Sequence, residues 1–344
     1  MNRILISCVL ALICAVSCTK EGARTTVQDG ELRIVLNTGA VQTRATTPGD
    51  GVVADGGGIY LDGSNVPDLV ILVADSNGDI VQTYPGSNAT LGADPTTTAM
   101  SVSISGLSDG AHTVYAFGNT EGLWAMESGG SAVTDLSSLT TSSEVEALQF
   151  SALSADTCPE LTASRLPSSA TGSVTITNGN GEISLEMIRC VAKVSMEFVN
   201  KTGASLELDG FNFSIEDLCP DRGYVAYHAL PNVPASISYG DIVKNVGDDV
   251  TFSNGESKTY TFYVFPGTAP DGKYLLNAGF TANNAAEASS FTDLPVHDDH
   301  SVDITSLERN QHLHIVTRIS KGLTVSFNFE VEDWTDLEEN MHFD

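Results

Sequence analysis

The sequence predicts an all-β fold built from sandwiches of short strands. Apolar runs rich in Val, Ile, Thr, Phe and Tyr recur along the chain, and Gly, Asn, Asp or Ser residues bound each of them. Stretches with a helical period are scarce, and 344 residues are long enough for two domains. Short strands at this spacing, interrupted by turn residues, favour two β-sandwiches.

The first expected strand lies near the N-terminus. Leu32, Ile34 and Leu36 alternate with polar or smaller residues, so one face of this strand would pack on a core. A hairpin is expected next, with strands at 70–74 and 80–84, because Asn77-Gly78 supplies the positive φ angles of a tight turn.

The acidic turn of this hairpin resembles a calcium loop only superficially. Asp75, Asn77 and Asp79 stand at alternate positions, but Ile80 occupies the place where such a loop needs glycine. Gly86 stands where the loop needs its final glutamate. We therefore expect an ordinary turn here.

Strand patterns continue through the rest of the chain, with one interruption at 131–150, where a helical turn or two is expected. The turn residues Asn178-Gly179-Asn180-Gly181 suggest a domain boundary within 178–189, so we expect domains at 45–183 and 184–344. The further strands are expected at 99–104, 112–117, 172–177, 181–187, 191–199, 205–213, 257–265, 274–281, 312–319 and 323–331.

The N-terminus has the pattern of an export signal. Arg3 precedes an apolar run from Ile4 to Val16, shorter than the roughly 20 residues that span a membrane. Ala15-Val16-Ser17-Cys18 resembles the bacterial lipobox, so residues 1–18 are expected to form a lipoprotein signal that ends at a lipidated, palmitate-bearing Cys18. The alternatives are an ordinary signal peptide with a chance cysteine, or a buried apolar helix.

Composition excludes several function classes. The chain has 44 acidic and 16 basic residues, a formal net charge of −28, which repels nucleic acids and anionic bilayers. Association with a membrane would therefore depend on the lipid. Of the cysteines beyond Cys18, Cys158, Cys190 and Cys219 permit one disulfide whose connectivity is open, and their spacing matches no zinc motif.

No catalytic motif emerges, and we expect no enzyme activity, cofactor or metal. The chain lacks a Gly-x-Ser-x-Gly elbow, a His-Glu-x-x-His pair and a phosphate-binding loop. One group of metal-ligand residue types is better explained as a polar loop followed by strand residues. This group comprises His297, Asp298, Asp299, His300, His312 and His314.

Several short motifs, in their order and spacing, resemble the fimbrillins, the subunit family of the type V pili of Bacteroidales. The motifs are the lipobox at Cys18, Thr43-Arg44-Ala45, Arg189-Cys190-Val191-Ala192-Lys193-Val194, Arg309-Asn310-Gln311-His312-Leu313-His314 and Val331-Glu332-Asp333-Trp334. The resemblance implies two transthyretin-like β-sandwich domains in tandem and export as a lipoprotein. It also implies that an arginine-specific protease cuts between Arg44 and Ala45 and removes a propeptide at 19–44.

The resemblance further implies a mode of assembly. Removing residues 19–44 takes away the strand with Leu32, Ile34 and Leu36, and a strand from another subunit can fill the exposed trough by donor-strand exchange. Head-to-tail repetition builds a filament. The implied donor lies at the C-terminal end and includes Val331, Trp334, Leu337, Met341 and Phe343.

These observations lead us to expect a stalk or tip subunit of a cell-surface fimbria that contributes to adhesion. Its expected partners are other fimbrial subunits, including further copies of the chain, the maturation protease, and the outer membrane through the precursor's lipid. One alternative is an anchor subunit that keeps its lipid. Another is a monomeric outer-membrane lipoprotein that binds glycans or host protein through aromatics such as Trp124 or Tyr227.

Overall fold

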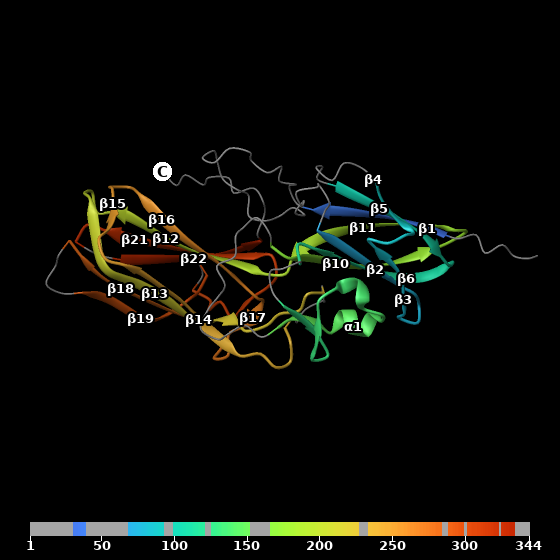
Figure 1. Ribbon diagram of the computed structural model, residues 1–344. Coiled ribbons are helices and arrows are strands. Elements are labelled where there is room, and N and C mark those ends of the chain that lie inside the picture. Colours follow the sequence, from blue (N-terminus) through green and yellow to red (C-terminus); the bar gives the residue numbers. More distant parts are fainter. Residues whose placement is uncertain are drawn as a thin grey trace, which may run out of the picture.

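The expected all-β fold is confirmed by the computed structural model, which describes residues 30–38, 68–92, 99–120, 125–151, 166–226, 233–283, 288–298, 301–322 and 325–333. Figure 1 shows an elongated molecule, with strands β1 to β6, β10 and β11 towards one end and most strands from β12 onwards towards the other. Among the described residues, no helix is long and apolar enough to cross a membrane.

Two strand layers enclose the core of the first sandwich. One layer has the order β11-β1-β5-β4 and the other β10-β6-β2-β3. Strand β11 joins them, because it pairs with β1 along 180–187 and with β10 only at 188–189. The strands are β1 (Gly30–Thr38), β2 (Leu69–Ala74), β3 (Ile80–Tyr84), β4 (Ala89–Gly92), β5 (Ala99–Leu107), β6 (Gly110–Gly118), β10 (Ser168–Ile176) and β11 (Asn180–Arg189).

The β2–β3 hairpin is stabilised by its acidic turn. The Asp75 carboxylate accepts hydrogen bonds from the backbone N–H groups of Asn77 at 2.8 Å and Asp79 at 3.1 Å. These bonds hold the pKa of Asp75 below its usual value, because they stabilise the ionised form. Gly78 has a φ of +87°, which a side chain would disfavour. The ordinary turn expected from the sequence is thus what the backbone forms.

Two further sheets enclose the core of the second sandwich. Their orders are β16-β12-β21-β22 and β14-β13-β18-β19, with β15 paired to β13. The core between them contains the aromatic cluster of Phe198, Phe211 and Phe213. The strands are β12 (Ala192–Lys201), β13 (Leu206–Pro220), β14 (Tyr239–Gly247), β15 (Val250–Phe252), β16 (Ser257–Val264), β18 (Leu275–Ala282), β19 (Ser289–Pro295), β21 (Gln311–Ser320) and β22 (Val325–Asp333).

A third core lies between the two sandwiches. It includes the 131–150 region, which contains the 3-10 helix η1 (Leu136–Ser138) and the short helix α1 (Ser142–Glu146), as expected. Tyr115 on β6 donates a hydrogen bond to Glu146, and Phe150 stacks on Phe265 at 5.3 Å. Three short strands complete this region: β7 (Met126–Ser128), β8 (Ser131–Val133) and β9 (Leu148–Phe150). Elsewhere, β17 (Gly267–Thr268) pairs with β20 (Ser306–Leu307).

A buried arginine connects the two sandwiches. Arg309 Nη1 donates to Ser169 Oγ on β10 at 2.9 Å, and its Nη2 donates to the carbonyls of Tyr224 and Ala226. Beside it, Arg189 Nη1 donates to Asn310 Oδ1 at 2.7 Å. Two of the motifs that carried the family resemblance, at 189–194 and 309–314, therefore meet at this junction.

The domain division expected from the sequence falls within a strand of the first sandwich. The sequence placed it at 183/184, but this point lies inside β11, whose residues pair with β1 and β10. Ala192 then begins β12 in the second sandwich. We therefore propose that the division lies at Arg189-Cys190, after the last residue of β11. The Asn-Gly pairs at 178–181 lie in the tight turn between β10 and β11.

The junction should contribute strongly to stability. Arg309→Ala leaves buried carbonyls without their donor, and each such loss costs about 1–3 kcal/mol, so we expect the free energy of unfolding to fall by at least about 2 kcal/mol. Urea denaturation checks this. The control is Lys321→Ala at an exposed position after β21, which should stay within about 0.5 kcal/mol. Equal effects of the two substitutions would contradict the role of Arg309.

Candidate functional site: strand β1 and its groove

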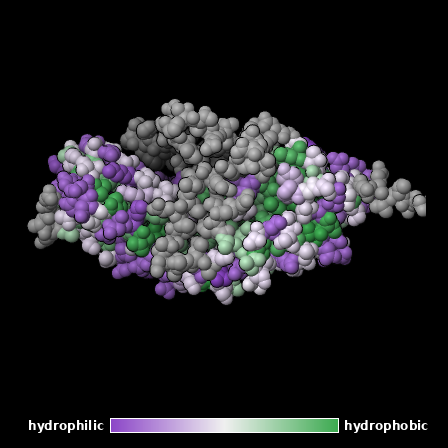
Figure 2. All heavy atoms as spheres, in the orientation of Figure 1, coloured by the Kyte–Doolittle hydropathy of each residue, from purple (hydrophilic) through white to green (hydrophobic). Residues whose placement is uncertain are grey.

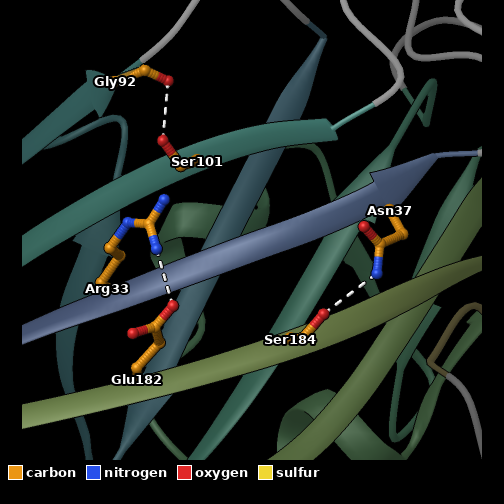
Figure 3. Close-up of polar contacts among 6 residues, drawn as sticks. All are labelled: Arg33, Asn37, Gly92, Ser101, Glu182 and Ser184. Carbon is orange, nitrogen blue, oxygen red and sulfur yellow. Dashed lines mark hydrogen bonds and ion pairs between the residues drawn. The ribbon is translucent and has the colours of Figure 1, made fainter.

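Strand β1 lies in the interior of its layer, not at an edge. It runs parallel to β11, with Glu31 opposite Asn180 and Thr38 opposite Met187. On its other side it runs antiparallel to β5, where Asn37 lies opposite Ala99. Figure 3 shows this blue strand between its two neighbours. Removing β1 would leave backbone hydrogen-bonding groups on both neighbours without partners, which is unfavourable in water.

The inward side chains of β1 are fully buried. Leu32, Ile34 and Leu36 each have 0% exposed surface, so the alternation read from the sequence is confirmed. Gly181 on β11 makes room for Leu32, because an added Cβ there would lie 3.3 Å from Leu32 Cδ1. Burial of three such side chains contributes roughly 1.5–3 kcal/mol each.

We call the space that β1 fills between β5 and β11 the β1 groove. Its two sides come from the neighbouring strands and carry apolar residues on the inner face. The register places Met100, Val102 and Ile104 of β5 and Ile183 and Leu185 of β11 opposite the three inward side chains of β1 or beside them. An occupant of this groove needs apolar side chains at three alternate positions.

The outward side chains of β1 make polar contacts with β11. Arg33 Nη1 donates to Glu182 Oε1 at 2.6 Å, and Asn37 Nδ2 donates to Ser184 Oγ at 3.0 Å (Figure 3). The side chains of Arg33 and Glu182 are 54% and 63% exposed. An exposed ion pair contributes only about 0.2–1 kcal/mol, so it helps to set register more than it stabilises the strand.

Most other residues of the predicted site fall outside the described residues. These are Cys18, Arg44, Ala45, Trp334, Leu337, Met341 and Phe343. Val331 lies on β22, half-buried against the second core, so residues 325–331 belong to a resident strand as the sequence suggested. In the described part of the chain, β22 has a paired neighbour only on its β21 side.

Among the described residues, no member of the histidine group takes part in a cluster of three metal-ligand side chains. His312 and His314 stack at 5.5 Å, and their Nε2 atoms contact Ser195 and Glu197 on β12. His297 instead packs against Phe329, which belongs to the core of the second sandwich. Asp299 and His300 lie outside the described residues.

One acidic group was missed by sequence reasoning. The carboxylates of Glu207, Asp209 and Asp249 approach one another within 4.8 Å, although 42 positions separate the first from the last. Asp209 Oδ1 already accepts a hydrogen bond from the backbone N–H of Asp249 at 3.0 Å. No short motif in the sequence signals such a group, because only the pairing of β13 with its neighbours assembles it.

The cysteines differ in state. Cys219 is disulfide-bonded, whereas Cys190 is a free and fully buried thiol. Burial raises the pKa of the Cys190 thiol, and nearby Arg309 opposes that rise. Cys190 is therefore an inert part of the junction core in this structure.

The two faces of β1 should differ in their response to mutation. Ile34→Ala removes a fully buried side chain and should lower the free energy of unfolding of the uncut chain by about 2–5 kcal/mol. Val35→Ala, on the outward face of the same strand, is the matched control and should cost about 1 kcal/mol or less. Urea denaturation of both variants tests this, and similar losses would mean that β1 is not anchored through its inward face.

Solved structures show proteins of similar fold. A candidate cell adhesion protein from Bacteroides eggerthii DSM 20697 superposes with a TM-score of 0.54 at 11% identity, covering 89% of this chain and 96% of its own. A fimbrilin (fimA) from Porphyromonas gingivalis W83 gives a TM-score of 0.52 at 11% identity, covering 90% of this chain and 98% of its own. At such identity the likeness establishes the fold alone. No curated protein matches the chain by sequence.

A family model identifies the chain more directly. The model of the fimbrillin-A associated anchor proteins Mfa1 and Mfa2 matches residues 61–338, which is most of the chain. The chain therefore belongs to this family, and the resemblance to fimbrillins is confirmed. Membership makes it a protein of fimbriae, hence of the cell surface, and its relatives are structural proteins rather than enzymes.

Proposed function

We propose that this chain is a fimbrial subunit whose β1 strand is a placeholder, removed by proteolysis and replaced by a strand from a neighbouring subunit. The observation that carries the proposal is the interior position of β1. It pairs on both sides and buries Leu32, Ile34 and Leu36 completely, so its loss creates a groove that only another strand can fill well.

The proposed cut lies close to the end of this strand. Arg44-Ala45 follows Thr38, the last residue of β1, by six positions. Before the cut, the tether keeps β1 at a high effective concentration, on the order of mM, and an external strand cannot compete. After the cut, β1 is held by non-covalent contacts alone and can exchange.

The register of β1 defines what a donor must satisfy. It must run parallel to β11 and antiparallel to β5, with apolar residues at three alternate positions. A head-to-tail series of such pairings extends a filament without closing. Within this chain, the expected donor is the segment from Val331 through Trp334, Leu337, Met341 and Phe343. Other fimbrial subunits are the alternative source.

The role of a monomeric glycan-binding lipoprotein has less support. Large apolar side chains are exposed at only three described positions, which are scattered: Val81, Val243 and Val302. In Figure 2 the described surface is a mixture of hydrophilic residues and small apolar patches. Trp124 and Tyr227, the aromatics considered as binding platforms, lie outside the described residues.

Cleavage at Arg44 is the step that tests this function. Arg44→Ala should abolish incorporation of the subunit into fimbriae while leaving the thermal stability of the precursor unchanged, because β1 stays tethered in its groove. Immunoblots and N-terminal sequencing of sheared surface fimbriae provide the measurement. The matched control is Arg24→Ala, which should assemble normally. Assembly of uncut Arg44→Ala chains would show that removal of β1 is not the switch.

A second candidate role is that of a fimbrial anchor that retains its lipid on Cys18. It is favoured by one observation, the match to a family described as anchor proteins. The two roles differ in the N-terminus of the surface form, which starts at Cys18 in an anchor and at Ala45 in a stalk or tip subunit.

Lipidation itself is tested at Cys18. Cys18→Ala should eliminate incorporation of labelled palmitate and leave the precursor stalled before maturation, because no other cysteine ends the apolar signal segment. Cys14→Ala, inside that segment, is the control and should label normally. Persistent label in the Cys18 variant would place the lipid on another residue.

A further inference from the structure

Charge is distributed very unevenly along the first half of the chain. Between Ala45 and Ile188 there are seventeen acidic residues and one basic residue, Arg165. The segment 19–44 has four basic and three acidic residues. The segment proposed to leave on maturation therefore takes with it four of the five basic residues found between 19 and 188. What remains is a strongly negative sandwich.

The rim of the β1 groove shares this imbalance. Arg33 lies opposite Glu182, its ion-pair partner at 2.6 Å, and Asn37 lies opposite Glu186 in the register with β11. On the other side, the residues of β5 opposite Arg33 and Val35 are Ser103 and Ser101, which carry no charge. When β1 leaves, Glu182 loses its cation, and the rim presents two carboxylates.

The chain's own C-terminal end does not complement this rim. Residues 325–344 contain seven acidic residues and neither lysine nor arginine. The expected donor segment, 331–344, holds six of these carboxylates, namely Glu332, Asp333, Asp336, Glu338, Glu339 and Asp344, so negative charge is spread along its whole length. In the β1 groove, these side chains would meet the carboxylate side of β11. Like charges opposite each other across a strand pair are destabilising.

We propose that the β1 groove selects a donor strand of a different fimbrial subunit, one with lysine or arginine at the register of Arg33 and apolar residues at the registers of Leu32, Ile34 and Leu36. The C-terminal strand of a second copy of this chain is disfavoured. This proposal rests on the proposed function, because it assumes that β1 can be replaced.

Two electrostatic effects produce the selectivity. The local effect is the replacement of an attractive pair at Glu182 by a repulsive one, which lowers the affinity of the groove for the donor about three- to tenfold. The long-range effect is the repulsion between two cut chains of residues 45–344, each with 11 basic and 41 acidic residues and hence a formal net charge of −30, which slows their encounter at low ionic strength. Both effects weaken with salt, because the Debye length falls from about 30 Å at 10 mM to about 3 Å at 1 M.

Strand exchange on the full chain tests the proposal. The chain from residue 19 to 344 is cut between Arg44 and Ala45, so that β1 stays bound without a covalent link. It is then incubated with excess synthetic peptide, and native mass spectrometry measures the fraction of protein that has exchanged. The peptides are residues 29–43 unchanged, the same with Arg33→Lys or Arg33→Glu, a neutral control with Val35→Thr, and residues 325–344.

We expect the unchanged, Arg33→Lys and Val35→Thr peptides to exchange to similar extents at about 10 mM ionic strength. The Arg33→Glu peptide should bind about three- to tenfold more weakly, and the 325–344 peptide more weakly still. The differences due to charge should shrink at about 1 M salt. In a Glu182→Arg protein, whose ion pair is reversed, the Arg33→Glu peptide should bind better than the unchanged one.

The failures of the two proposals are distinguishable. If residues 325–344 bind as tightly as the unchanged β1 peptide at low salt, or if Arg33→Glu has no effect, charge selection is wrong and the groove still accepts strands. If no peptide exchanges, including the unchanged β1 sequence, then β1 is not replaceable, and the proposed function fails together with the selectivity.

Discussion

The structure depends on the pairing of one strand, β1, with a neighbour on each side. Its nine residues bridge β5 and β11, which are far apart in sequence, and their inward side chains fill the centre of the first core. The layer β10-β6-β2-β3 does not contain β1, but the layer β11-β1-β5-β4 cannot be continuous without a strand in that position. The expected cleavage point lies next to this strand, and loss of the strand would leave two unpaired strand edges that another strand has to fill.

The second sandwich and the junction form the part of the molecule that does not depend on β1. The core of the second sandwich contains more aromatic side chains than the core of the first, and it does not include β1. The buried guanidinium of Arg309 ties the second sandwich to β10 through Ser169 and to the backbone at 224–226. Because β10 belongs to the layer opposite β1, the loss of β1 leaves this connection in place. Replacement of one strand can thus be confined to one layer.

Much of this arrangement could be predicted from the sequence, for identifiable reasons. The alternation of Leu32, Ile34 and Leu36 is a local signal, and so is the Asn77-Gly78 turn, and both were confirmed. Partners far apart in sequence gave no such signal. The pairing of β1 with β11, the contact of Arg309 with Ser169 and the approach of Glu207 to Asp249 arise only from the tertiary fold. The strand β14 was missed because Asp241, Lys244 and Asn245 interrupt its apolar pattern, and the Asn-Gly pairs at 178–181, from which the domain division was predicted, lie in a hairpin turn.

The central claim is that β1 alone completes the first sandwich and can be separated from it. Amide hydrogen exchange, measured by mass spectrometry on the uncut chain and on the chain cut at Arg44-Ala45 after removal of residues 19–44, tests this most directly. In the uncut chain, the amides of β5 and β11 that face β1 should exchange slowly. After removal they should exchange much faster, while β12 and β21 in the second sandwich keep their protection. Unchanged protection of β5 and β11 would contradict the account, and so would a loss of protection that spreads through both sandwiches.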